Sequence, residues 1–168
     1  MATIEQYKTG WVPKASKMAV DLMQSTQGVL LETDHGKMIY KEIQSFAPMR
    51  LNEKQAFALI DDADMCAVGE RSCKCNYEDA PYSETVFLNE LAEAVVASGK
   101  ARWVDKETAK ASIKKYSGLP IITSKVSGRY MEICRSWPKK CIYWNMEMHK
   151  VRCIKRINKC ADIMPIQE

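Results

Sequence analysis

The sequence NEKQAFALIDDADMCAVG, residues 52–69, decides the fold because a helix signal in it runs directly into a strand signal. Asn52 followed by Gln55 is a capping-box pattern that predicts a helix start. The apolar positions after it recur at helical spacing: Ala56, Leu59, Ile60 and Ala63. The apolar run 66–69 then predicts a short strand that ends in a glycine turn. Helix and strand in such close succession favour an α+β fold.

Toward the C-terminus, helix-capping residues and glycines divide the chain into further short elements. Ser83 is expected to cap a helix that Gly99 ends, with Val86 and Phe87 on its apolar face. Residues 102–104 predict a strand, and Asp105 is expected to cap a helix that stops at Gly118. Residues 120–134 predict a hairpin that turns through 126–128 and carries Cys134 at its end.

Toward the N-terminus, residues 13–27 predict a helix that begins at a proline and closes at Gly28. Residues 29–33 and 37–41 predict two short strands around a turn, with a continuing helix as the alternative. We therefore expect one largely helical α+β domain over residues 1–168. It would comprise an N-terminal helix and hairpin (1–48), a helical and hairpin core (49–133) and a basic, cysteine-rich metal-binding segment (134–160).

Composition narrows the class of protein. A chain of 168 residues with 46% apolar and 27% charged residues suits one globular domain. No apolar run reaches the roughly 18 residues that a membrane span needs, and the first residues lack a secretory signal pattern. We expect a cytoplasmic protein without a membrane span.

The seven cysteines gather in two patches, Cys66, Cys73 and Cys75, and then Cys134, Cys141, Cys153 and Cys160. In a reducing compartment an odd number of cysteines favours metal ligands or reactive thiols over disulfides. The second patch repeats one pattern, since six residues separate the cysteines of each of its pairs. This repeat predicts a local four-thiolate set made by the second patch. Cys66, in the apolar run, is expected to belong to the core.

Charge is concentrated in the same segment. Between Cys134 and Cys160 the chain has eight basic residues and one acidic residue, Glu147. Such cations can stabilise thiolates, bind phosphates with Trp137, Tyr143 and Trp144 as stacking surfaces, or form a docking surface for an acidic partner. His149 lies between Cys141 and Cys153 and could ligate a metal or donate to a sulfur.

Residues 49–136 resemble a cysteine-containing module of 4Fe–4S proteins from anaerobic bacteria and archaea. The matching features are the helix ending at 60–64, the strand 67–69 leading to Cys73-Lys74, the helix at 105–109 and the hairpin that reaches Cys134. Aligned on residues 67–69, Arg71 stands where the family has its first loop cysteine. Lys74 then stands where the family has an arginine.

The resemblance implies a composite ligand set of Cys73, Cys134, Cys141 and Cys153, beside the local set that includes Cys160. The resemblance also favours an iron–sulfur cluster of the 4Fe–4S type over zinc, which is the alternative. We expect Lys74, Arg135 and His149 to lie near the cofactor. The function it implies is electron transfer, or an accessory role, in anaerobic metabolism, with an acidic redox protein as partner. The alternatives are a zinc-containing winged-helix-like regulator that binds nucleic acid and a small enzyme with an open-site cluster.

Overall fold

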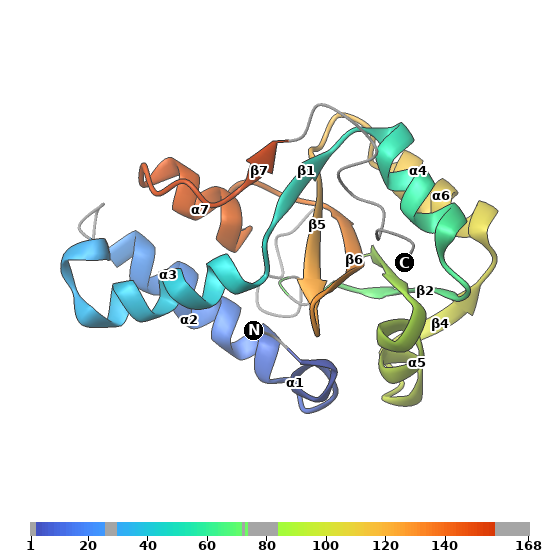
Figure 1. The fold of residues 1–168 in the computed structure, drawn as a ribbon, viewed down its shortest axis with the longest axis horizontal. Coiled ribbons are helices and arrows are strands. Elements are labelled where there is room, and N and C mark those ends of the chain that lie inside the picture. The colour runs from blue at the N-terminus through green and yellow to red at the C-terminus, as the bar shows by residue number, and fades with distance from the viewer. Residues whose placement is uncertain (1–2, 26–29, 72, 74–83, 157–168) are drawn as a thin grey trace, which may run out of the picture.

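A seven-stranded mixed sheet organises the part of the chain that the structure, a computed structural model, describes: residues 3–25, 30–71, 73 and 84–156 (Figure 1). Its strands are β1 Met49–Leu51, β2 Cys66–Glu70, β3 Glu84–Leu88, β4 Ala101–Val104, β5 Ile121–Val126, β6 Arg129–Arg135 and β7 Lys155–Arg156. Their order across the sheet is β4-β2-β3-β6-β5-β1-β7. Neighbouring strands are antiparallel except β1 and β7, which are parallel.

Helices surround the sheet, so the predicted α+β class is confirmed. They are α1 Ile4–Lys8, α2 Trp11–Ser25, α3 Asp34–Ser45, α4 Glu53–Asp62, α5 Asn89–Ala97, α6 Lys106–Lys115 and α7 Ile142–Met148, with a 3₁₀ turn at Leu30–Glu32. Among the described residues, no helix has the length and apolar character that crossing a membrane requires.

The main core forms where helices pack on the central strands. In β2 both the inward and the outward positions are buried, from Cys66 to Gly69. Since alternate side chains of a strand point to opposite faces, both faces of β2 must be covered. Helices α5 and α6 both contact β2 and β3, while α4 packs on α6, β1 and β5. Cys66 is 4% exposed within this core, as predicted.

A second, smaller core joins the N-terminal helices to the C-terminal segment. It consists of Val20, Met23, Ile43, Met146 and Val151, which come from α2, α3 and the region of α7. Figure 1 shows α2, α3 and α7 together at the opposite side of the molecule from α4 and α6. The cysteine-rich segment is thus built onto the N-terminal helices.

Two predicted helix starts are confirmed by their capping contacts. The Asn52 side chain accepts a hydrogen bond from the Gln55 amide at 2.9 Å, and the Gln55 side chain accepts one from the Asn52 amide at 2.8 Å. Asp105 accepts a hydrogen bond from the Thr108 amide at 2.7 Å at the start of α6. Each cap satisfies amides that the first turn of a helix leaves unbonded.

The predicted hairpin is also confirmed, as β5 and β6. Its turn residues Ser127 and Gly128 both have positive φ angles, 48° and 86°. Positive φ at both central residues is the geometry of the two-residue turns that match the twist of antiparallel strands. The hairpin brings Cys134 opposite Thr85 of β3 and Ile122 of β5.

The prediction of a helix from Ser83 is wrong for residues 84–88, which form β3. Thr85, Val86, Phe87 and Leu88 are all buried and pair with β2, and residues 85–87 also pair with β6. A short apolar run buried on both faces has no alternation, so periodicity does not distinguish it from a helix segment. The helix α5 begins only at Asn89. Ser83 itself lies outside the described residues.

The prediction of two strands around a turn at 34–36 is also wrong. Residues 34–45 form α3, and the Thr33 hydroxyl accepts a hydrogen bond from the Gly36 amide at 3.0 Å. Ile43 of this helix is buried in the second core. The predicted N-terminal helix is confirmed as α2, which starts at Trp11, so that Pro13 occupies its first turn.

Candidate metal centre

Three cysteines from distant segments lie close together in the structure. Cys73 follows β2 in a turn, Cys134 is the second-last residue of β6, and Cys141 precedes α7 as its N-cap. Burial raises the pKa of the Cys134 thiol most, and Glu132, Cys141 and Cys73 raise it further, while Cys141 also raises the pKa of Cys73. The sheet and the turn after β6 therefore bring together three of the predicted ligands.

The three thiols are shielded from solvent. Cys141 is 6% exposed, and Cys73 and Cys134 are partly buried. Burial is the main cause that raises the pKa of all three thiols, that of Cys73 to about 12. A buried thiolate is costly unless a cation or a metal stabilises it.

Arg71 supplies a cation beside all three thiols. Its side chain is 1% exposed, and its positive charge lowers the pKa of Cys73, Cys134 and Cys141 against the effect of burial. Its Nη1 donates a hydrogen bond to the Arg135 carbonyl oxygen at 3.3 Å. Because that carbonyl is one residue from Cys134, the hydrogen bond fixes the guanidinium next to the end of β6.

A partly buried carboxylate completes the charged surroundings. Glu132 of β6 accepts hydrogen bonds from the Tyr7 hydroxyl at 2.5 Å and the Ser124 hydroxyl at 3.3 Å. Burial raises the pKa of Glu132, while Tyr7, Ser124 and Arg71 lower it. Tyr143, which is partly buried, interacts with Glu132 and with the Ser124 side chain. Thiols, guanidinium and carboxyl group thus form one polar cluster inside the protein.

Cys153 belongs to the edge of this cluster. Its thiol donates a weak hydrogen bond to the Tyr143 carbonyl at 3.5 Å, and its amide donates to Glu147 at 2.9 Å. Burial is the largest cause that raises the pKa of Cys153 to about 12, and Glu147 and Cys141 raise it further. Cys141 is therefore the described thiol of the cluster that acts on Cys153.

The other predicted site residues lie differently. The Arg135 guanidinium is directed away from the thiols, to the Ile113 and Leu119 carbonyls and to Glu53. The ring of His149 contacts the Met23 carbonyl through Nε2 at 2.6 Å, which fastens the end of α7 to α2. Lys74, Cys75 and Cys160 lie outside the described residues.

No three His, Cys, Asp or Glu side chains within the described ranges are arranged to hold a single metal ion. The thiols are neighbours that do not converge on one point. The four described members of the composite set belong to one neighbourhood, whereas the local set includes Cys160, which the structure does not describe.

The prediction from sequence missed Glu132, Tyr7 and Ser124 at this site. One signal was present: Glu132 and Cys134 are two residues apart on one strand, so their side chains share a face. Tyr7 gave no such signal, because only the packing of α1 against the sheet brings it to Glu132. A comparison with protein families, with curated proteins and with solved structures found no match for this chain.

Proposed function

We propose that this protein binds an iron–sulfur cluster of the 4Fe–4S type and acts as an electron-transfer or accessory component. The observation that supports the proposal best is that Cys73, Cys134 and Cys141 are near enough inside the fold to raise one another's thiol pKa. Four thiolates, completed by Cys153, are the donor set that such a cluster takes. A cluster also spans several ångströms, which suits thiols that do not meet at one point.

The residues around the thiols fit a cluster. Four thiolates around an iron–sulfur core carry net negative charge, and the buried Arg71 guanidinium offsets part of it. We assign to Arg71 the role of charge compensation for which Arg135 was predicted, since the Arg135 side chain binds other groups. Hydrogen bonds from Tyr7 and Ser124 hold the Glu132 carboxyl group in place.

When bound, the cluster would store one electron at a potential that the surrounding charges and the burial of the site set. The partner that fits this protein is an acidic electron-transfer protein. Five basic residues of the C-terminal segment are exposed and form a docking surface of matching charge: Lys139, Lys150, Arg152, Lys155 and Arg156. Opposite charges on two proteins speed their encounter and orient them.

The structure gives less support to the winged-helix-like regulator. The hairpin β5–β6, which would act as the wing, lies inside the sheet between β3 and β1. A wing reaches nucleic acid from an edge, and strands paired on both sides do not. The open-site enzyme would need a cluster with three thiolate ligands, which Cys73, Cys134 and Cys141 would supply.

The test is metal analysis of protein purified without oxygen, with iron, acid-labile sulfide and zinc measured beside a visible spectrum. We expect matched iron and sulfide and an absorption that dithionite bleaches. The variants Cys73→Ser, Cys134→Ser and Cys141→Ser should each lose most of the iron. Cys66→Ala is the matched control, since Cys66 is buried in the core away from the cluster.

A colourless protein that contains one zinc would overturn the iron–sulfur proposal in favour of the regulator. Full iron content in all three serine variants would overturn the ligand assignment. If Cys153→Ser alone keeps its iron and the cluster then binds small ligands, the open-site enzyme becomes the better description.

A further inference from the structure

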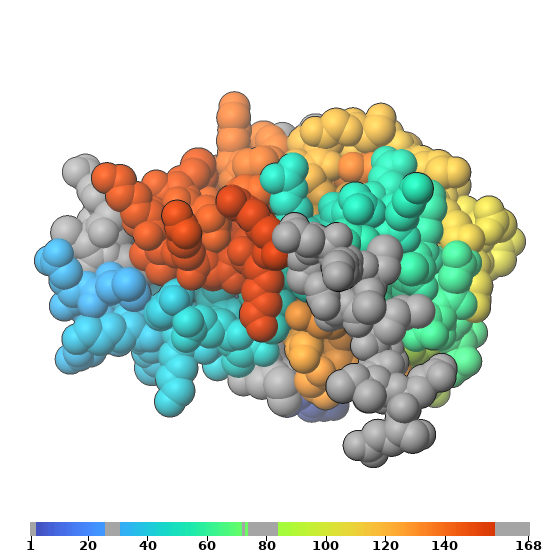
Figure 2. All heavy atoms as spheres, turned by 45° about the horizontal axis from the view of Figure 1, so that its top comes forward, coloured from blue at the N-terminus to red at the C-terminus, as the bar shows by residue number. Residues whose placement is uncertain are grey.

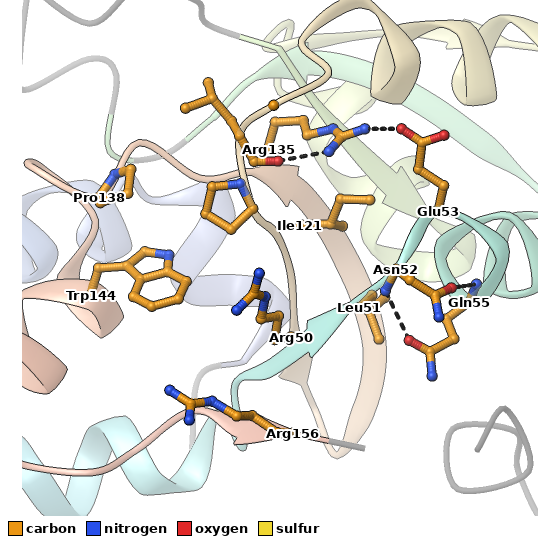
Figure 3. Close-up of a pocket in the computed structure, with 13 residues that line it drawn as sticks. Arg50, Leu51, Asn52, Glu53, Gln55, Ile121, Arg135, Pro138, Trp144 and Arg156 are labelled. Atoms are coloured by element: carbon orange, nitrogen blue, oxygen red, sulfur yellow. Dashed lines mark hydrogen bonds and ion pairs between the residues drawn. The ribbon is translucent and has the colours of Figure 1, made fainter. Parts of the chain in front are cut away.

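The surface of the protein has a cavity whose lining residues are not part of the candidate metal centre. It is an open cavity of about 590 Å³, and its described lining contains no cysteine (Figure 3). Strand β1, the start of α4, the loop before β5, the chain after β6, and β7 all contribute to it. Its volume falls in the range typical of small-molecule sites, roughly 300–1,000 Å³.

Two arginines lie side by side on one wall of this cavity. Arg50 of β1 and Arg156 of β7 are direct partners in the parallel strand pair, and both are exposed. Like charges placed opposite each other on neighbouring strands destabilise a sheet. A bound anion would remove this repulsion, so the pairing favours an anionic ligand at this wall.

Little in the described chain neutralises these two charges. Arg156 has one distant contact with Glu147, at 3.9 Å, and the other carboxylate oxygen of Glu147 accepts the amides of Cys153 and Ile154. No described side chain forms an ion pair with Arg50. The Glu53 carboxylate, also in the lining, is bound to Arg135. Figure 2 shows the surface of the C-terminal segment that carries Arg156, in red.

A flat apolar wall stands across from the arginines. The indole of Trp144 extends into the cavity next to Pro138 (Figure 3). Its Nε1 donates a hydrogen bond to the Ser136 hydroxyl at 2.7 Å, and Ser136 in turn donates to the Pro120 carbonyl at 3.1 Å. The ring is therefore held in one orientation and presents a face on which a planar group can stack.

We infer that this cavity binds a small phosphorylated ligand with a planar ring, of the mononucleotide class. The phosphate would bind between the guanidinium groups of Arg50 and Arg156, whose forked donors match phosphate oxygens. The ring would stack on Trp144. A phosphate monoester carries close to two negative charges at neutral pH, which matches two arginines better than a single carboxylate does.

The test is calorimetric titration of the purified protein with AMP and UMP, and with adenosine and inorganic phosphate for comparison. We expect both nucleotides to bind and adenosine to bind at least about tenfold more weakly, since a charge-assisted pair contributes about that factor. Arg50→Gln and Arg156→Gln should each weaken nucleotide binding by a similar factor. Trp144→Leu should weaken nucleotide binding and leave inorganic phosphate unaffected.

Arg152→Gln is the matched control, because Arg152 is exposed on the same segment and is not in the cavity lining. Equal loss in this variant would show a general charge effect and overturn the site. Inorganic phosphate binding as tightly as AMP would overturn the role of the ring. Tighter binding of a single-stranded oligonucleotide, weakened by Arg152→Gln, would overturn the proposal in favour of a nucleic-acid surface. None of these outcomes depends on metal content, so Cys73→Ser protein should give the same affinities.

Discussion

Tyr7 and Glu132, 125 residues apart, are joined by a hydrogen bond from the phenolic hydroxyl of the helix α1 residue to the carboxylate of the β6 residue. Tyr7 is 6% exposed. This contact ties the N-terminus to the strand that carries Cys134, so the first helix helps to hold the candidate metal centre in place.

Replacing Tyr7 with phenylalanine tests that contact. Tyr7→Phe removes the buried hydroxyl that donates to the partly buried Glu132 carboxyl group, and loss of such a partner costs about 1–3 kcal/mol. We expect the free energy of unfolding, measured with urea at neutral pH, to fall by that amount. Tyr40→Phe is the control, since its hydroxyl makes only a 3.4 Å exposed contact; an equal loss there would contradict the special role of Tyr7.

Arg135 should be far more important for stability than its partner Glu53. The Arg135 side chain is 7% exposed and binds two carbonyls besides Glu53, whereas the Glu53 side chain is 44% exposed. We expect Arg135→Ala to cost about 3–5 kcal/mol, because it leaves buried acceptors without donors. Glu53→Gln should cost about 1 kcal/mol or less, since water screens the exposed carboxylate. Similar losses in denaturant unfolding of the two variants would contradict this assignment.

Close packing requires a glycine at position 69, because the start of the neighbouring strand β4 lies against it. A Cβ at this position would overlap the Lys100 carbonyl oxygen and the side chain of Ala101. We expect Gly69→Ala to lower the free energy of unfolding by about 1–3 kcal/mol, the usual cost of overpacking. Adding Ala101→Gly should restore only part of the loss, because the carbonyl oxygen is backbone. Complete recovery in thermal unfolding of the double variant would show that the backbone contact is unimportant.

Asp105 makes stability depend on pH in the acidic range. Hydrogen bonds from Thr108 hold the pKa of the Asp105 carboxyl group below its ordinary value. The carboxylate therefore stabilises the fold above the pKa of the unfolded chain, about 3.9, and this contribution is lost as the pH falls through the folded value.

Asp105→Asn keeps the capping oxygen and removes the charge. Between about pH 5 and pH 3, the range around the unfolded pKa, we expect this variant to lose less stability than the wild type. Thermal unfolding at each pH measures that loss. An identical acid dependence of the two proteins would show that Asp105 does not contribute. Asp105→Ala should be less stable than Asp105→Asn throughout, since it has no cap.

Local signals in the sequence predicted several elements correctly. Asn52 and Gln55 predicted the start of α4, Asp105 that of α6, and the turn at residues 126–128 the hairpin that carries Cys134. In each case the deciding interaction joins residues three positions apart, or depends on backbone angles at a turn, so the information is present in a few neighbouring residues.

The strand β3 could not be predicted from the sequence because it is buried on both faces. Val86 and Phe87 fit an apolar helix face as well as a central strand. At the candidate site, the resemblance and the residue type singled out Cys73, Cys134 and Cys141 as ligands, and these three thiols are near one another in the structure. Arg71, Tyr7 and Glu132 joined them only in three dimensions.

The sequence by itself determined the α+β class, the caps of α4 and α6, the hairpin and the presence of a basic segment rich in thiols, because these follow from residue type and short spacing. Only the tertiary structure decided which thiols are neighbours, where the Arg135 guanidinium points and that Arg50 lies opposite Arg156. Those relations depend on strand order and register, which are set by the burial of apolar surface between segments far apart in the chain.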